Sequence, residues 1–415
     1  MSEFKYEDAF VNAMPAREGE STFDRLRPFR EAESASRAAS WVKQGTYGRP
    51  SDHPLGVTVF GLWEQPFDGH AEQIRRTALA LAETGCPVHL RSWAPSAGGP
   101  SNAAYQQQKR VYRLIHASIA MSSCEVWMLP PQPGLVARVM RHRFLAADEV
   151  AALNRRRCVA TGGWPGEVPA EEVEALKLVG QVWVANMLDL SKLARAGFPG
   201  ERLRIVPCPA MPPSRERPDR PKGPRSFYAI GDWARQRCAL LIEAFMEAFR
   251  PGQAKLYLRS APPDTVWRIV EPILARPASK HHGWTVEHFN RDVKVFAAPV
   301  SDRGLAEMHE RLGTYCALAE HERMDVAGVD AIEAGASILA APQSSLMGMV
   351  TEDRLADEPL RLGFSAADVA RAMVAGSAAW TPSRRVADAG TVMRQALREL
   401  VAAAGGTNLY EGCEV

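Results

Sequence analysis

Two arginines at a predicted turn between a strand and a helix are the first residues in this sequence that could bind an anion. Arg235 and Arg237 follow the apolar run 227–231 and precede an apolar helix face. Arginine presents a planar fork of N–H donors, which binds phosphate through paired, charge-assisted hydrogen bonds. We therefore expect Arg235 to contact a phosphate group, with Arg237 as the second candidate. The alternative for both is a solvated position at the start of a helix.

A second expected phosphate contact lies closer to the amino terminus. Gly69 and His70 follow the first predicted strand, where a loop enters a helix. The free N–H groups and partial positive charge of a helix N-terminus attract phosphate, and glycine lets a ligand approach the backbone closely. The alternative is an ordinary turn glycine beside a surface histidine.

Two carboxylates in the second half of the chain have a spacing that could serve a ligand with neighbouring hydroxyls. Glu322 and Asp330 are separated by seven residues, and Asp325 and Glu333 offer the same spacing in a shifted register. Each carboxylate oxygen can accept a hydrogen bond, so such a group suits a pair of hydroxyls. Acidic residues also stabilise helix N-termini, which is the competing structural explanation.

Short apolar runs alternate with amphipathic segments from residue 56 onward and must position these side chains. The spacing of Ile74, Ala78 and Leu81 predicts one face of a helix. Alternating strands and helices imply parallel pairing, and hence two doubly wound, Rossmann-like α/β domains with a cleft between them. The expected strands are 57–60, 88–90, 126–128, 158–160, 182–184, 203–206, 227–231, 256–258, 293–296, 315–318 and 338–340.

A proline-rich stretch divides the chain. Residues 207–224 hold seven prolines with charges between them, which predicts an interdomain linker of limited flexibility. The expected parts are a helical or partly disordered extension (1–54), a first domain (55–206), this linker, a second domain with C-terminal helices (225–404) and a tail (405–415).

The composition is that of an ordinary globular protein. Of 415 residues, 46% are hydrophobic and 24% are charged, and the net charge is +2. No apolar run approaches the ~18 residues of a transmembrane helix, and the charged amino terminus argues against a signal peptide. The seven scattered cysteines favour reduced thiols, so we expect a cytoplasmic protein with no metal site. The usual P-loop, dinucleotide, zinc-protease and α/β-hydrolase motifs are absent.

Several segments of the sequence resemble segments of the GT-B glycosyltransferases, in particular the retaining family 4 group, and they occur in the same order along the chain. They are 230–237 with the helix start 241–245, then 295–310, then 322–330 with 331–340, and in the first half 182–186 with 197–207. The resemblance spans roughly residues 56–400. It departs from the family pattern at Asp330, where the family has glutamate, and at 161–169, where the acidic member of a Trp-Glu pair is missing.

The resemblance implies an enzyme that moves a sugar from a nucleotide-sugar, such as a UDP-sugar, to an acceptor hydroxyl. It implies retention at the anomeric carbon and no cofactor beyond the donor. Glu322 would then lie near the donor sugar, Asp330 would bind the ribose hydroxyls, and Arg235 would stabilise the leaving diphosphate. The other expected donor-binding residues are Gly69, His70, Gly231, Asp232, Arg237, Asp325 and Val326. The alternatives are an epimerase of the same architecture, or a degenerate homologue that binds a nucleotide or a polymer.

The acceptor is expected on the first domain, where arginines gather. The acceptor-side candidates are Trp164, Arg141 and Arg143. The wider set of arginines comprises Arg75, Arg76, Arg138 and Arg155 to Arg157. A cationic surface would suit a phosphate-bearing acceptor, including a hydroxylated base in DNA. A neutral glycan or lipid acceptor would need no such surface, and solvated arginines are the plain alternative.

Overall fold

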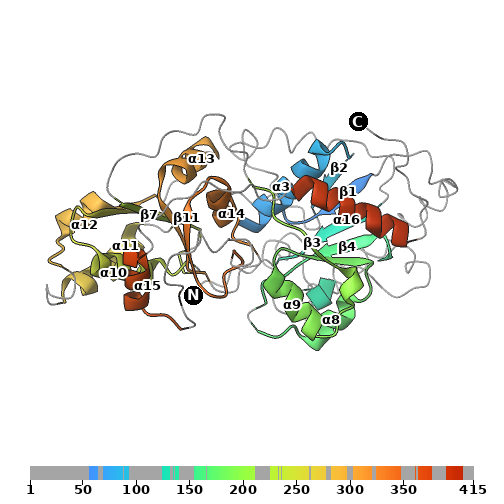
Figure 1. Cartoon of the computed structure of the whole chain (residues 1–415), viewed down its shortest axis with the longest axis horizontal. Helices are drawn as coiled ribbons and strands as arrows, with labels where there is room; N and C mark the ends of the chain where they lie inside the picture. Colours follow the sequence, from blue (N-terminus) through green and yellow to red (C-terminus); the bar gives the residue numbers. More distant parts are fainter. Residues whose placement is uncertain are drawn as a thin grey trace, which may run out of the picture.

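The computed structural model places two α/β domains beside each other (Figure 1). The residues that it describes are 56–63, 69–86, 88–92, 124–130, 134, 136–139, 154–164, 166–210, 225–231, 233–234, 236–260, 263–276, 282–296, 302–319, 324–346, 360, 363–375 and 389–404. The expected extension, the expected tail and most of the expected linker lie outside these residues.

The first domain contains a six-stranded parallel sheet of order β2-β1-β3-β4-β5-β6. Its strands are β1 (Val57–Phe60), β2 (Val88–Arg91), β3 (Cys124–Met128), β4 (Arg157–Ala160), β5 (Gln181–Val184) and β6 (Leu203–Ile205). In the register of the sheet, Val59 lies between Leu90 and Val126. The helices between these strands are α3 (Gly69–Glu83), α8 (Ala170–Leu176) and α9 (Met187–Arg195), with a 3₁₀ turn at Gly200–Arg202.

The second domain contains a five-stranded parallel sheet of order β11-β10-β7-β8-β9. Its strands are β7 (Arg225–Ile230), β8 (Ala254–Arg259), β9 (Val293–Val295), β10 (Thr314–Ala317) and β11 (Ser337–Ala340). Its helices are α10 (Cys238–Ala248), α11 (Pro263–Leu274), α12 (Val286–Asp292), α13 (Asp302–Arg311), α14 (Val326–Glu333) and α15 (Ala366–Ala375). The predicted fold class is therefore confirmed.

The apolar pattern of the sequence accounts for these elements. Strands β1, β4 and β5 are buried along their whole length, because helices cover both faces of a parallel sheet. Ile74, Ala78 and Leu81 form the buried face of α3, as their spacing predicts. No helix within the described ranges is both long and apolar enough to cross a lipid bilayer.

The last described helix, α16 (Ala389–Ala403), packs on the first domain. Arg394 also donates a hydrogen bond to the carbonyl of Thr84, 3.0 Å away at the end of α3. Three apolar side chains of the helix are buried in the core of the first domain: Met393, Leu397 and Leu400. This contact corrects the expected division of the chain, which gave all of 225–404 to the second domain. The pattern of these residues shows which face of the helix is buried, but it does not show which sheet buries it.

In both sheets the strand order reverses beside the first strand. Strand β1 lies between β2 and β3, and β7 lies between β8 and β10. Ligands of open α/β sheets bind outside the carboxyl ends of the strands at such a reversal. Helix α3 follows β1 and α14 follows β10, and these two helices contact each other across the domain boundary (Figure 1). The two candidate ligand edges therefore lie close to each other.

Candidate functional site

Gly231 forms the turn that follows β7 at the reversal in the second sheet. Its φ of 139° is in the range that favours glycine. A Cβ atom at this position would lie 3.2 Å from the Cγ atom of Gln236. The side chain of Gln236 is buried and hydrogen-bonds to Asp325. The turn after β7 and the segment before α14 are therefore joined at the carboxyl edge of the sheet.

Asp325 is the N-cap of α14 and is fully engaged in local hydrogen bonds. Its carboxylate accepts hydrogen bonds from the backbone N–H of Gly328 and from the hydroxyl of Tyr315, each at 2.9 Å. Its own backbone N–H donates to Oγ of Ser345, also at 2.9 Å. Burial raises the pKa of Asp325 to about 6. The backbone N–H of Asp325, an expected donor-binding residue, is thus used to hold this segment.

A buried aromatic cluster lies behind Asp325. The hydroxyl oxygen of Tyr315 also lies 3.3 Å from the carbonyl oxygen of Ile230. The hydroxyl of Tyr228 lies 3.1 Å from Nδ1 of His309, and the rings of Tyr228 and Tyr315 meet edge to face. Burial lowers the pKa of His309 to about 4. These contacts fix β7, β10 and α13 to one another beneath the candidate site.

His309 and Asp325 predict opposite pH dependences of stability. The folded pKa of His309 is below its unfolded value of ~6.5, so its contribution is present above that pH and is lost as the pH falls toward 4. The folded pKa of Asp325 is raised, so its contribution is present below about pH 4 and is lost as the pH rises through 6. The contributions of these two groups therefore oppose each other between pH 4 and 6 in the wild type.

Replacing either group should reveal the pH dependence of the free energy of unfolding that the other group causes. His309→Gln should make the free energy of unfolding fall by about 1 to 3 kcal/mol from pH 4 to 6. Asp325→Asn should make it rise over the same interval. Urea denaturation at a series of pH values measures both slopes. Equal slopes in the wild type and both variants would contradict the opposed titrations.

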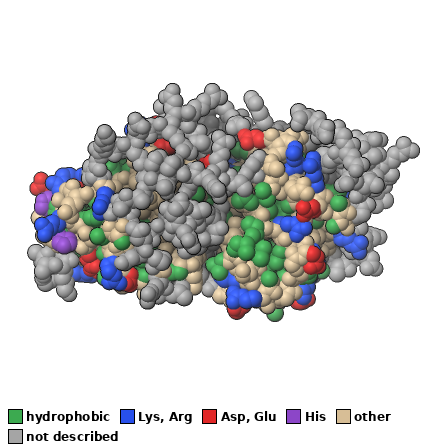
Figure 2. Space-filling view, viewed as in Figure 1, with side chains coloured by type: hydrophobic (Ala, Val, Ile, Leu, Met, Phe, Trp, Pro, Cys, Tyr) green, Lys and Arg blue, Asp and Glu red, His purple; other side chains and the backbone are tan. Residues whose placement is uncertain are grey.

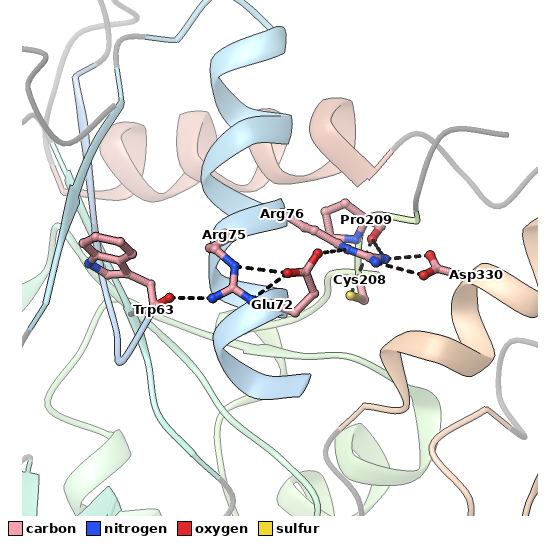
Figure 3. Close-up of polar contacts among 7 residues, drawn as sticks. All are labelled: Trp63, Glu72, Arg75, Arg76, Cys208, Pro209 and Asp330. Carbon is pink, nitrogen blue, oxygen red and sulfur yellow. Dashed lines mark hydrogen bonds and ion pairs between the residues drawn. The ribbon is translucent and has the colours of Figure 1, made fainter. Parts of the chain in front are cut away.

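Asp330, further along α14, is bound by an arginine from the other domain (Figure 3). Arg76 of α3 donates to both carboxylate oxygens of Asp330, at 2.6 and 2.8 Å. Arg76 also pairs with Glu72, one helical turn earlier, at 2.8 Å. The side chains of Arg76 and Asp330 are 10% and 4% exposed. This ion pair is therefore largely buried and spans the domain boundary.

A second arginine completes this group. Arg75 donates to Glu72 at 2.7 Å and to the carbonyl of Trp63 at 2.6 Å (Figure 3). We call Glu72, Arg75, Arg76 and Asp330 the interdomain cluster; its two positive and two negative charges balance. Although burial opposes the charged form, Asp330 and Glu72 hold the pKa of Arg76 above its ordinary value. Burial likewise raises the pKa of Glu72, but the two guanidinium groups outweigh that effect and lower it.

The interdomain cluster corrects one expectation and adds residues that the sequence analysis missed. Arg75 and Arg76 were counted toward a cationic acceptor surface, but both are held by carboxylates. Arg157, from the same set, is buried and pairs with Glu125 at 2.8 Å. Glu72 stands three and four residues before the two arginines, a spacing that favours ion pairs on a helix. That spacing was the available signal for the part of the cluster within α3.

Gly69 and His70 are the first two residues of α3, as predicted. A Cβ atom at Gly69 would meet no other atom within 4 Å among the described residues. Gly69 lies seven residues before Arg76, which corresponds to about 10 Å along the helix. The start of α3 is thus open and is close enough to the domain boundary to contact a ligand there.

Arg237 has a different environment from the expected one. It is the N-cap of α10 in a left-handed conformation, with a φ of 48°. Its guanidinium lies over the ring of Phe364, 4.8 Å from the centroid. Phe364 belongs to the hydrophobic core formed with α10 and α15. A cation–π contact of this kind holds the side chain against the second domain.

Trp164 is buried in the first domain. Its indole N–H donates to Glu172 at 2.7 Å, and its carbonyl accepts a hydrogen bond from Lys192. Glu172 is itself fully buried and also accepts the backbone N–H of Gly134 at 2.7 Å. Trp164 therefore stabilises the segment after β4, and its ring packs in the core of the domain.

A small hollow lies at the carboxyl edge of the first sheet. Gln73 and Thr77 of α3 line it on one side, and Met393 of α16 also contributes. The remaining residues come from the ends of the strands and the segments that follow: Met128, Ala160, Trp183, Val184, Ala185, Val206 and Pro207. The lining is mainly apolar. Helix α3, which contributes Gln73 and Thr77 to the lining, also carries Glu72, Arg75 and Arg76 of the interdomain cluster.

Five expected site residues lie outside the described residues: Asp232, Arg235, Glu322, Arg141 and Arg143. Their roles stay predictions. In the chain, Arg235 falls between Gly231 and α10, and Glu322 falls between β10 and α14. The shifted register would pair Asp325 with Glu333, but Glu333 is the last residue of α14 and lies at the end of the helix remote from the carboxyl edge of the sheet. We therefore retain the register that pairs Glu322 with Asp330. Val326, another expected residue, is the first residue of α14 and is buried.

Comparisons with known proteins identify the fold. The sequence matches no protein-family model and no curated protein. Among solved structures, the sucrose-phosphate synthase from Thermosynechococcus elongatus matches with a TM-score of 0.52 and 13% identity, over 84% of this chain and 96% of that chain. The apo form of the lipopolysaccharide outer core galactosyltransferase WaaB matches with a TM-score of 0.50 and 10% identity, over 84% and 99%. These structural neighbours are GT-B glycosyltransferases, and the present chain has the same two-domain fold.

Proposed function

We propose that this protein is a glycosyltransferase that moves a sugar from a nucleoside diphosphate donor to an acceptor hydroxyl. One observation carries the proposal: the carboxyl edges of the two sheets approach each other where α3 contacts α14. Gly231, Asp325 and Asp330 lie on the second-domain side of this junction, as a donor site there requires. The likeness to the two GT-B structures, which covers 84% of this chain, supports the same conclusion.

The proposed donor lies mainly against the second domain. Its diphosphate gains negative charge as the glycosidic bond breaks, so preorganised donors of hydrogen bonds lower the barrier. We assign this role to Arg235, and the partial positive charge at the start of α3 would assist. Glu322 would lie beside the sugar, and Asp330 would accept hydrogen bonds from the ribose hydroxyls.

The proposed reaction retains the configuration of the anomeric carbon and uses no metal ion or cofactor. The bond between the anomeric carbon and the diphosphate oxygen breaks, and the acceptor oxygen bonds to the same face of the sugar. The leaving diphosphate oxygen takes the proton of the acceptor hydroxyl, so no separate protein base is needed. Most of the rate acceleration would come from positioning the two substrates.

The proposed acceptor site is the carboxyl edge of the first sheet. Met187 and Leu188, at the start of α9, are 51% and 37% exposed there. Figure 2 shows hydrophobic side chains gathered on the face of the first domain next to the domain boundary. Because Arg75, Arg76 and Arg157 are buried in ion pairs, we favour a glycan or lipid acceptor over DNA or another polyanion.

A panel of nucleotides tests the proposed function. UDP, GDP, ADP and their sugar conjugates are each added to the protein, and the melting temperature is measured. A true donor or its diphosphate at a hundredfold excess over Kd should stabilise the protein by about 2.7 kcal/mol. The donor so identified should be consumed only when an acceptor is present. Conversion of the sugar without an acceptor would instead indicate an epimerase, and binding without turnover would indicate a degenerate homologue.

A further inference from the structure

The bond from Arg76 to Asp330 makes part of the proposed donor site depend on the first domain. Asp330 belongs to α14 of the second domain, and it is the carboxylate to which we assign the ribose. Both of its oxygens accept hydrogen bonds from the guanidinium of Arg76, a residue of α3 in the first domain (Figure 3). The direction of this carboxylate is therefore set by a side chain of the other domain.

The paired bonds are compatible with a ribose on the same carboxylate. An ionised carboxylate has about four lone pairs, and a guanidinium fork uses one lone pair on each oxygen. The fork of Arg76 thus does not by itself exhaust the acceptor capacity of Asp330. Because the Asp330 side chain is only 4% exposed, a hydroxyl that binds it is withdrawn from water, and such a bond depends strongly on the direction of the acceptor.

The guanidinium of Arg76 is itself held from three sides. Its Nε donates to Glu72, one turn earlier on α3, at 2.8 Å. Its Nη1 lies 3.4 Å from the carbonyl oxygen of Pro209, in the described start of the segment that connects the domains. The third side is the paired contact with Asp330 on α14. A planar group fixed in this way presents the carboxylate of Asp330 with one preferred orientation.

The charge of Arg76 also suits the proposed donor site. The diphosphate of the donor is negative, and an unneutralised carboxylate beside the nucleoside would repel it. Arg76 neutralises Asp330, and the bond between them holds α3 against α14. The start of α3 thereby stays at the domain boundary, where its partial positive charge assists the diphosphate that the second domain binds.

We propose that Arg76 is a positioning residue for the nucleoside of the donor: from the first domain, it orients the carboxylate of Asp330 toward the ribose hydroxyls. The inference rests on the proposed function, because that function assigns the ribose to Asp330. Arg76 stays bonded to Asp330 while the donor is bound, so the ribose contact is complete only when α3 contacts α14. Recognition of the ribose and this contact between the domains then favour each other by the same factor.

Removal of single ribose hydroxyls tests this role. The Kd of UDP, GDP or ADP, whichever binds, is measured by titration calorimetry and compared with the Kd of its 2′-deoxy and 3′-deoxy forms. A hydrogen bond to a charged group corresponds to about a 10- to 100-fold difference in Kd, so the wild type should bind at least one deoxy form that much more weakly. In Arg76→Met, the same comparison should give a difference of less than about threefold.

Arg75→Met is the matched control for this test. Arg75 shares the partner Glu72, but it donates to the carbonyl of Trp63, within the first domain. This variant should keep the wild-type ratio between the Kd of the deoxy form and the Kd of the ribose form. A general loss of structure, or the loss of a positive charge near the diphosphate, would raise both Kd values alike. The ratio therefore reports the orientation of the carboxylate.

A double-mutant cycle tests whether Arg76 acts through Asp330. Asp330→Asn keeps the size of the side chain but replaces one acceptor oxygen with an amide, so it should lose most of the preference for ribose. Adding Arg76→Met to Asp330→Asn should then change the Kd ratio by less than about twofold. A further large loss in the double variant would show that Arg76 contacts the ribose by itself, and would overturn the positioning role.

The outcomes separate this role from the proposed function. A wild-type ratio in Arg76→Met would overturn the positioning role and leave the proposed function standing. Equal affinity of the wild type for the ribose and both deoxy forms would overturn the positioning role and the assignment of the ribose to Asp330, while donor turnover would still support a transferase. No binding of any nucleotide would overturn both proposals.

A conservative variant covers the case in which Arg76→Met does not fold. Arg76→Lys keeps the charge but lacks the planar fork that orients the carboxylate. Its Kd ratio should lie between one and the wild-type value. A ratio as large as that of the wild type would count against the positioning role.

Discussion

Arg235→Ala should lower kcat by about 10²- to 10³-fold and leave the protein folded, the scale of removing one preorganised donor from a developing charge. In the chain, Arg235 falls between Gly231 and Gln236, after β7, the strand beside which the order of the second sheet reverses. A paired bond to the leaving diphosphate would be made most strongly in the transition state, so kcat should fall more than donor affinity. Single-turnover kinetics with the donor found in the nucleotide panel measure both quantities.

Arg237→Ala is the matched control for this prediction. It removes a second arginine from the same turn, but this guanidinium lies over Phe364. We expect its kcat to fall by less than about tenfold, with a loss of stability of about 0.5 to 1 kcal/mol from the cation–π contact. A larger kinetic loss in Arg237→Ala than in Arg235→Ala would reverse the assignment. Unchanged kinetics in both variants would show that the diphosphate does not bind at this turn.

Asp330→Ala should lower the free energy of unfolding by about 1 to 3 kcal/mol, because the buried Arg76 then keeps only Glu72, which it shares with Arg75, as a carboxylate partner. Urea denaturation followed by tryptophan fluorescence measures the loss. The control is Glu399→Ala, which removes an ion pair with Arg204 whose side chains are 32% and 40% exposed. Exposed pairs contribute about 0 to 1 kcal/mol, so this control should change stability little.

A double replacement separates a lost charge pair from general damage to the boundary. Arg76→Met/Asp330→Leu replaces both charges with apolar side chains, and such exchanges are often neutral or stabilising. We therefore expect the double variant to recover most of the stability that Asp330→Ala loses. If the double variant is as unstable as the single one, the ion pair does not account for the loss, and packing in α14 does.

The strands were predictable from the sequence because each contains a short run of mainly apolar residues. All eleven expected strands are present, including short ones such as β9. The placement of α16 was not predictable in the same way. Met393, Leu397 and Leu400 lie on one helical face, but any sheet with an uncovered apolar surface would satisfy them. Local periodicity determines what is buried, and only the three-dimensional structure determines where.

The candidate site was predictable where it depends on position along the sheet. Gly231 and Asp325 follow strands β7 and β10, so the reversal in strand order brings them to one edge. The contact of Arg76 with Asp330 joins residues 254 positions apart. Arg75 and Arg76 are adjacent and equally basic in the sequence, and no local pattern shows which of them faces the other domain.

Because α16 packs on the first domain, that domain is built from two separate segments of the chain. Helix α15 packs on the second domain and α16 on the first, so the chain crosses between the domains a second time after the crossing near Pro209. A gene fragment that stopped before residue 225 would lack α16 and would leave Ile74 and Leu81 without part of their cover. In the order of the chain, the second domain therefore lies between two segments of the first. Recombination that exchanged it for another donor domain would need two junctions in the gene, one on each side of the inserted segment.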